Sequence, residues 1–150
     1  MDNSTFRIPP GERDYRVTVW GTLPNDALLL GFFPHMHLRG KSFEYTVVYP
    51  DGHSELLMRV PKYDFFWQLD YQLAKPLTIP PGSTIVCTAY YDNSPNNPKN
   101  PDPTATVRFG EQSWEEMMIG FYDVVLPADM NIREFFAPRK TEGATSGSGQ

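Results

Sequence analysis

The chain is organised around residues 28–41, which read Leu-Leu-Leu-Gly-Phe-Phe-Pro-His-Met-His-Leu-Arg-Gly-Lys. Residues 27–33 are continuously apolar, which predicts a central strand covered on both faces near its start. The histidines follow where this strand leaves the core. Because successive side chains on a strand point to opposite faces, His35 and His37 project to one side and Met36 to the other.

This His-x-His pair is a candidate metal site. Two imidazoles held on one strand can bind one ion together, and imidazole suits copper, zinc, iron and nickel. The motif alone is not specific, because a polar step at a strand end gives the same pattern. The third histidine, His53, lies in a Pro-Asp-Gly-His hairpin turn and is expected to be a solvated turn residue rather than a ligand.

Composition limits the class of protein. The 150 residues carry a formal net charge of -5 and no basic run, which argues against a nucleic-acid partner. No apolar stretch approaches the roughly 20 residues of a membrane-spanning helix, and the first residues are polar rather than a signal peptide. We expect one domain over residues 1–138. Residues 139–150 are too polar to pack and are expected to form a disordered tail.

The fold class follows from turns and alternation. Fifteen prolines, eleven glycines and 14% aromatic residues are typical of a compact all-β protein. The pattern predicts an antiparallel two-sheet β-sandwich of jelly-roll type with about eight or nine strands, and with the candidate site on the inner rim of one sheet. Predicted strands cover residues 15–20, 27–33, 42–49, 54–60, 84–91 and 104–109, followed by an apolar run that ends at residue 125.

Three connecting segments carry further expectations. Residues 92–103 form a long loop rich in Asn and Pro, a length that is usually functional or mobile. Residues 61–73 contain five aromatic residues and are expected to supply core and rim, a ligand-stacking surface being the less favoured use. Residues 127–138 are expected to close the domain, packed by Phe135 and Phe136.

The combination of residues 34–41 with a downstream Glu116-Met117 resembles the C-terminal domain of copper type II, ascorbate-dependent monooxygenases. Peptidylglycine α-hydroxylating monooxygenase and dopamine β-monooxygenase belong to this family, and the chain looks like a bacterial relative over about residues 6–126. In the family, a His-x-His and a later Met hold the oxygen-activating copper, called the M site. The resemblance implies that His35, His37 and Met117 bind one copper ion, although methionine is more often core filler.

The ligand set that the resemblance implies suits copper chemistry. Neutral imidazoles serve Cu(II), a thioether favours Cu(I), and three protein ligands leave a position open for water or dioxygen. In the family, copper activates dioxygen, a C–H bond of the substrate is hydroxylated, and ascorbate supplies the electrons. No catalytic residue beyond the metal ligands is implied. Family members of this kind also imply an extracytoplasmic location for the parent protein.

This sequence departs from the family in its partner domain. The family's second copper site, made of histidines alone, lies on a separate N-terminal domain. The chain has three histidines and cannot supply that site. We therefore expect a module of a larger protein with a second copper domain, which in isolation binds copper but is weakly active or inactive.

The implied substrate also differs. Peptide-amidating members clamp the substrate carboxylate with Arg, Asn and Tyr, and the corresponding residues here are Phe33, Ile119 and Phe121. This apolar trio suits a small apolar or aromatic substrate. Cys87 stands where the family has a half-cystine, and the partner position is Met118, so a thiol–thioether contact in the core is expected in place of the disulfide.

Two other functions stay open. The chain could be a copper-binding module for metal carriage or electron transfer without monooxygenase activity. It could also be a plain β-sandwich interaction domain whose histidine pair is vestigial. Hydrolytic enzymes are disfavoured, because the sequence lacks Gly-x-Ser-x-Gly and His-Glu-x-x-His motifs. Glu115 and Glu116 are expected to be rim charges rather than a catalytic pair.

Overall fold

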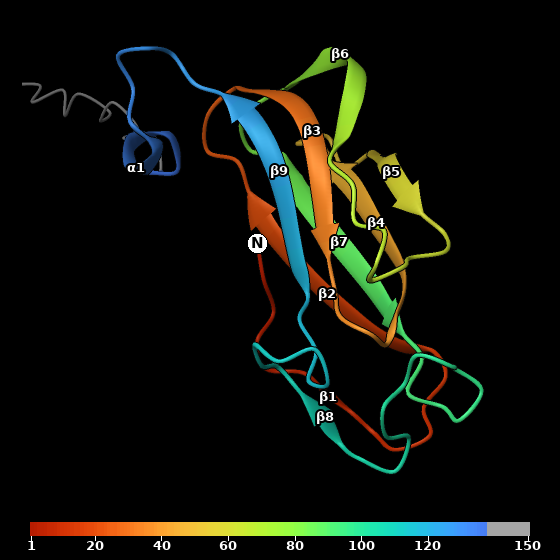
Figure 1. Ribbon diagram of the computed structural model, residues 1–150. Helices are drawn as coiled ribbons and strands as arrows, with labels where there is room; N and C mark the ends of the chain where they lie inside the picture. Colours follow the sequence, from red (N-terminus) through yellow and green to blue (C-terminus); the bar gives the residue numbers. More distant parts are fainter. Residues whose placement is uncertain (138–150) are drawn as a thin grey trace, which may run out of the picture.

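The computed structural model describes residues 1–137 (Figure 1). The disordered tail expected over residues 139–150 lies outside this part of the chain. The described part contains nine strands and one short helix: β1 (Arg7–Ile8), β2 (Tyr15–Thr22), β3 (Ala27–His35), β4 (Gly40–Val48), β5 (Ser54–Val60), β6 (Tyr71–Ile79), β7 (Thr84–Tyr91), β8 (Val107–Arg108), β9 (Ile119–Val125) and α1 (Ile132–Phe135).

The strands form two facing sheets and a small third one. A four-stranded sheet has the order β2-β7-β4-β5, and a three-stranded sheet has the order β6-β3-β9. Strands β1 and β8 pair separately at one end (Figure 1). All named strand pairs are antiparallel. The predicted antiparallel β-sandwich is confirmed, whereas the jelly-roll strand order remains a prediction.

The core lies between the two sheets and follows the alternation of their strands. In β7, every second residue from Ile85 to Tyr91 is buried, and β4 buries Phe43, Tyr45 and Val47 in the same way. The Phe32 ring of the facing sheet lies 4.6 Å from the Tyr45 ring, centroid to centroid. Aromatic contacts of this kind add to the apolar burial that joins the sheets.

A β-bulge in the middle of β3 decides which side chains face this core. Leu29 is opposite Val124 in β9 and Gly31 is opposite Asp123, so Leu30 has no partner of its own. One extra residue reverses the alternation. Ala27 and Leu29 are therefore buried before the bulge, and the even-numbered residues are buried after it, namely Phe32, Pro34 and Met36.

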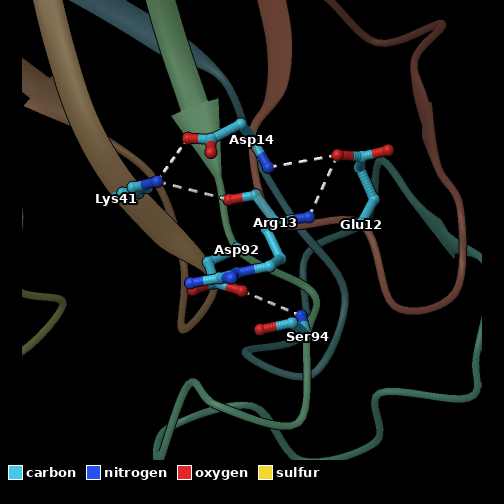
Figure 2. Close-up of polar contacts among 6 residues, drawn as sticks. All are labelled: Glu12, Arg13, Asp14, Lys41, Asp92 and Ser94. Carbon is cyan, nitrogen blue, oxygen red and sulfur yellow. Dashed lines mark hydrogen bonds and ion pairs between the residues drawn. The ribbon is translucent and has the colours of Figure 1, made fainter.

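The connection between β7 and β8 is held by its own polar side chains. Asn93 is fully buried, and its Nδ2 donates to the carbonyl oxygens of Pro9 (2.8 Å) and Ala105 (3.0 Å). Figure 2 shows the start of this loop, where the Asp92 carboxylate accepts from the Ser94 amide at 2.9 Å. These bonds favour an anchored loop over the mobile one that its composition suggests.

An ion pair lies at the same end of the sandwich. The Lys41 ammonium group contacts the Asp14 carboxylate, joining the start of β4 to the segment before β2 (Figure 2). The Glu12 carboxylate accepts the amide N–H groups of Arg13 (3.0 Å) and Asp14 (3.2 Å). The β1–β2 connection and the β3–β4 turn are thus held beside each other.

Several predicted boundaries differ from the observed ones. Strand β9 begins at Ile119, so Met117 precedes the strand that was expected to contain it. Strand β8 covers two residues of the six predicted. In the closing segment, Phe135 is fully buried as expected, whereas Phe136 is 44% exposed. Within residues 1–137, no helix has the length and apolar character needed to cross a membrane.

Candidate metal centre

The histidine pair lies on the outer face of the three-stranded sheet. His35 is opposite Ile119 in the β3–β9 ladder. A Cβ atom built on the next residue, Gly120, would lie 2.4 Å from the Cys87 Sγ atom, so Gly120 faces the core and Ile119 faces away from it. The expected inner-rim position is therefore wrong, because strict alternation from Leu29 would bring His35 inward and the bulge prevents this.

The two imidazoles lie next to each other, as their spacing predicts. Their ring centroids are 5.2 Å apart and the ring planes are nearly perpendicular, at 86°. His37 is 5% exposed and His35 is half-buried. The third histidine, His53, is exposed and its Nδ1 contacts the Asp51 carboxylate at 2.6 Å, as a turn residue would.

The tautomer of His35 is determined by Gln68, which lies in the β5–β6 connection. The His35 Nδ1 atom is 2.8 Å from Gln68 Oε1. Gln68 Nε2 donates to the Phe65 carbonyl oxygen at 2.9 Å, which orients the amide so that Oε1 is the atom facing the imidazole. An amide oxygen can only accept, so in the neutral ring His35 Nδ1 carries the hydrogen and Nε2 has the lone pair.

His37 has the same tautomer for the same reason. Its Nδ1 lies 3.3 Å from the Glu115 carbonyl oxygen, which also can only accept. Burial lowers the pKa of His37, and the hydrogen bond to the Glu115 carbonyl partly opposes this. The neutral ring, which is the form that binds metals, is therefore favoured. The Phe65 ring packs edge-on against His37 at 5.8 Å between centroids.

Met117 lies at the same end and on the same face of the sheet. Met118 and Gly120 are buried, whereas Met117 and Ile119 are partly exposed, so the alternation of β9 extends back to Met117. Ile119 is opposite His35, where the ladder between β3 and β9 ends, and Met117 lies two residues before this last pair. Within residues 1–137, no group of three or more His, Cys, Asp or Glu side chains is arranged to hold a metal ion.

Glu116 is not the charged rim residue that the sequence predicts. Its side chain is fully buried, and its two oxygens accept the backbone N–H groups of His37 (2.8 Å) and Arg39 (2.6 Å). Burial raises the pKa of Glu116 to about 8, against the opposing effect of these N–H donors and of the Arg39 charge. Arg39 is itself 1% exposed.

The residues expected to bind substrate form an apolar surface beside His35. Phe33 is opposite Phe121, with ring centroids 5.9 Å apart, and Ile119 is the cross-strand neighbour of His35. Phe121 is 47% exposed. The trio shares the outer face with the histidines.

The aromatic segment before β6, residues 61–70, also contacts the histidines. Phe65 and Gln68 contact them, while Phe66 and Trp67 are 74% and 69% exposed. Sequence reasoning did not identify Gln68 or the Glu115 carbonyl as partners of the imidazoles. Neither carries a motif, and the contacts span 33 and 78 residues of chain.

The cysteine prediction concerns the core behind the site. Cys87 and Met118 are both fully buried in the main core cluster, and Cys87 is a free thiol. Burial raises the pKa of Cys87 to about 12, which keeps the thiol protonated at neutral pH. The direct contact expected between Cys87 and Met118 remains a prediction.

Comparison with known proteins identifies the family. A search among curated proteins found no match. Residues 2–123 match the model of the family described as copper type II ascorbate-dependent monooxygenase, C-terminal domain. This stretch includes the histidine pair, the segment before β9 and most of both sheets. The chain therefore belongs to the copper type II ascorbate-dependent monooxygenases and represents their C-terminal domain.

Proposed function

We propose that this chain is a mononuclear copper-binding domain equivalent to the oxygen-activating, M-site half of an ascorbate-dependent monooxygenase. The proposed ligands are His35 Nε2, His37 Nε2 and the Met117 thioether. The observation that carries the proposal is the state of the imidazoles. Both Nδ1 atoms are bonded to obligate acceptors, which leaves both Nε2 lone pairs for a metal.

The ligand types favour copper over other ions. Two imidazoles with one thioether accept both Cu(II) and Cu(I), whereas zinc and iron sites rarely use methionine. When bound, copper would supply one-electron redox chemistry for the activation of dioxygen. The protein's part is to fix the two rings, keep His37 neutral and provide an apolar surface beside His35.

The surface beside the histidines supports a small apolar or aromatic substrate. Phe33, Ile119 and Phe121 offer no cation or hydrogen-bond donor for a carboxylate. Phe121 and Phe33 are placed to stack against a ring or an alkyl chain that approaches His35. Glycine-extended peptides are therefore disfavoured as substrates.

The remaining partners follow from the family. We propose that dioxygen and ascorbate, or another reductant, are co-substrates, and that a second copper domain belongs to the parent protein, which is extracytoplasmic. A single copper site holds one electron at a time, so hydroxylation needs an external source of the second. The isolated chain should bind copper and turn over weakly or not at all.

A second candidate is copper carriage or electron transfer without monooxygenase activity. The three histidines of this sequence cannot form both family sites, so its own residues support copper binding more directly than turnover. Electron-transfer copper centres keep a closed ligand sphere. Azide binding to the Cu(II) protein, seen as a change in its electron paramagnetic resonance spectrum, would indicate an open position and argue against this alternative.

The decisive experiment is copper analysis of the purified chain after exposure to Cu(II) and desalting. We expect one copper per chain, loss of copper in His35→Ala/His37→Ala, and unchanged copper in the control His53→Ala. Oxygen uptake with ascorbate then separates a monooxygenase from a carrier. Wild-type protein that retains no copper would overturn the proposal.

A further inference from the structure

Glu116 joins the two chain segments that carry the proposed ligands. Its Oε2 atom accepts from the His37 amide at 2.8 Å and its Oε1 atom from the Arg39 amide at 2.6 Å. The Gly40 amide donates to the His37 carbonyl at 3.1 Å, so His37 to Gly40 form a tight turn between β3 and β4. One buried carboxyl group thus holds two residues of that turn, His37 and Arg39, through their amide N–H groups.

The backbone around Glu116 is itself held on both sides. The Glu116 amide donates to the Arg108 carbonyl at 3.1 Å, and the Glu116 carbonyl accepts from the Gly110 amide at 3.0 Å. The next residue, Met117, accepts the Tyr91 hydroxyl on its carbonyl oxygen at 2.7 Å. The carboxylate therefore projects from a fixed point one residue before the thioether.

The Arg39 side chain adds a second connection between the same segments. Its Nη1 donates to the Trp114 carbonyl at 2.8 Å and its Nε to Asn93 Oδ1 at 2.7 Å. Arg39 therefore contacts the segment before Met117 twice, through its backbone N–H at Glu116 and through its guanidinium at Trp114. The Glu116 carboxyl group and the Arg39 guanidinium are both buried, so protein hydrogen bonds take the place of water at each of them.

We infer that Glu116 is a positioning residue that sets the distance between His37 and Met117, and with it the thioether contact to the metal. The inference rests on the proposed copper site. The spacing of His35 and His37 is local, because one residue separates them. Met117 has no such local link, since 79 residues separate His37 from Glu116 and only tertiary contacts fix the distance.

The test is Glu116→Gln, with the exposed Glu111→Gln as the matched control for loss of charge in the same segment. Glutamine keeps the size of the side chain, but its NH2 group would face one of the two backbone N–H donors. We expect Glu116→Gln to weaken Cu(I) binding by up to about tenfold, the lower end of the usual effect of losing a group that orients a ligand and no more than the loss of the thioether itself. Cu(II) binding, which rests on the imidazoles, should change much less.

Two readouts separate positioning from general stability. X-ray absorption of the Cu(I) protein should show a sulfur neighbour in wild type and Glu111→Gln, and lose it in Glu116→Gln. In the metal-free wild type, the His37 and Arg39 amides should exchange hydrogen slowly, a measurement that holds even where the variant fails to fold. Fast exchange at both amides would overturn the inference.

The remaining outcomes are distinct. Equal weakening of Cu(I) and Cu(II) in a folded Glu116→Gln protein would reduce Glu116 to a structural residue and overturn the inference. Cu(I) binding equal to wild type would do the same. Absence of copper from the wild-type protein would contradict the proposed function instead, whatever the variant does.

Discussion

The two halves of β3 have different roles: the residues before the bulge pack the core, and the outward-facing residues after it carry the candidate site. Before the bulge, Ala27 and Leu29 face the four-stranded sheet and fill the core. After it, Phe33 and His35 face away from the core, and Met36 turns inward. One unpaired residue, Leu30, separates a half that stabilises the fold from a half that presents the candidate site. A short strand can serve both purposes because its alternation can be reset.

The largest expected effect tests the packing half of the strand. Leu29→Ala removes a fully buried side chain and should lower the free energy of unfolding by about 2–5 kcal/mol. Phe33→Ala, in the second half, removes a larger but half-exposed side chain and should cost less. Urea unfolding of both variants measures the difference. An equal loss would mean that the two halves pack alike.

The next effect concerns the bulge itself. A Cβ atom at Gly31 would lie 2.8 Å from the Tyr71 carbonyl oxygen, a backbone atom that cannot move aside. Gly31→Ala should therefore destabilise the protein by about 2 kcal/mol, as overpacking does. Gly52→Ala in the exposed hairpin turn is a poor control, because its positive φ adds strain of another kind. Urea unfolding of Gly31→Ala and of the wild-type protein measures the loss, and equal unfolding midpoints would contradict this account of the bulge.

A smaller effect separates the two kinds of ligand. Met117→Ala should weaken Cu(I) retention by about tenfold, or roughly 1.4 kcal/mol, with a much smaller change for Cu(II). The reason is that the soft thioether contributes mainly to the reduced state. Competition with chelators selective for each oxidation state measures both. Equal losses would remove Met117 from the proposed site.

The smallest expected effect is a change in how the stability of the metal-free protein depends on pH, and it follows from the lowered pKa of His37. Because burial lowers its pKa in the folded chain, the unfolded chain binds more protons just below the usual value of about 6.5. The metal-free protein should therefore become less stable as the pH falls below that value. The His37→Gln variant should lose this component of the pH dependence. Unfolding curves at pH 5 and pH 7 for both proteins provide the check.

Copper retention should follow the same protonation. Protons compete with the metal for the imidazole nitrogens, so copper should be released as the pH falls through about 6, with the lowered pKa of His37 extending retention to slightly lower pH. Full retention at pH 4 would contradict imidazole ligation.

Local patterns predicted much of the sheet structure. Strands β5 and β7 begin and end where alternation and turn residues place them, at Ser54–Val60 and Thr84–Tyr91. The prediction of a six-residue strand over residues 104–109 was wrong for a physical reason. Only Val107 and Arg108 pair with β1, and Phe109 forms an isolated bridge to Glu116 instead, so regular strand pairing stops at Arg108. Strand length depends on the partner as well as on propensity.

The candidate site was predicted in part. The spacing of His35 and His37 requires neighbouring rings on one face, and this holds. Which face they occupy could not be read from spacing, because the position of a bulge depends on the neighbouring strands. The burial of Glu116 was also missed, since two adjacent glutamates look like surface charges until the turn that they bind is known.

The sequence by itself determined the all-β class, the common side of the two histidines and the family to which the chain belongs. These depend on the order of side chains along one segment and on motifs within it. Only the tertiary structure decided that the pair faces outward, that Gln68 and Glu115 hold the Nδ1 atoms, and that Glu116 holds the histidine turn against the methionine segment. Those contacts join residues 33 to 79 positions apart, and packing rather than local preference brings them together.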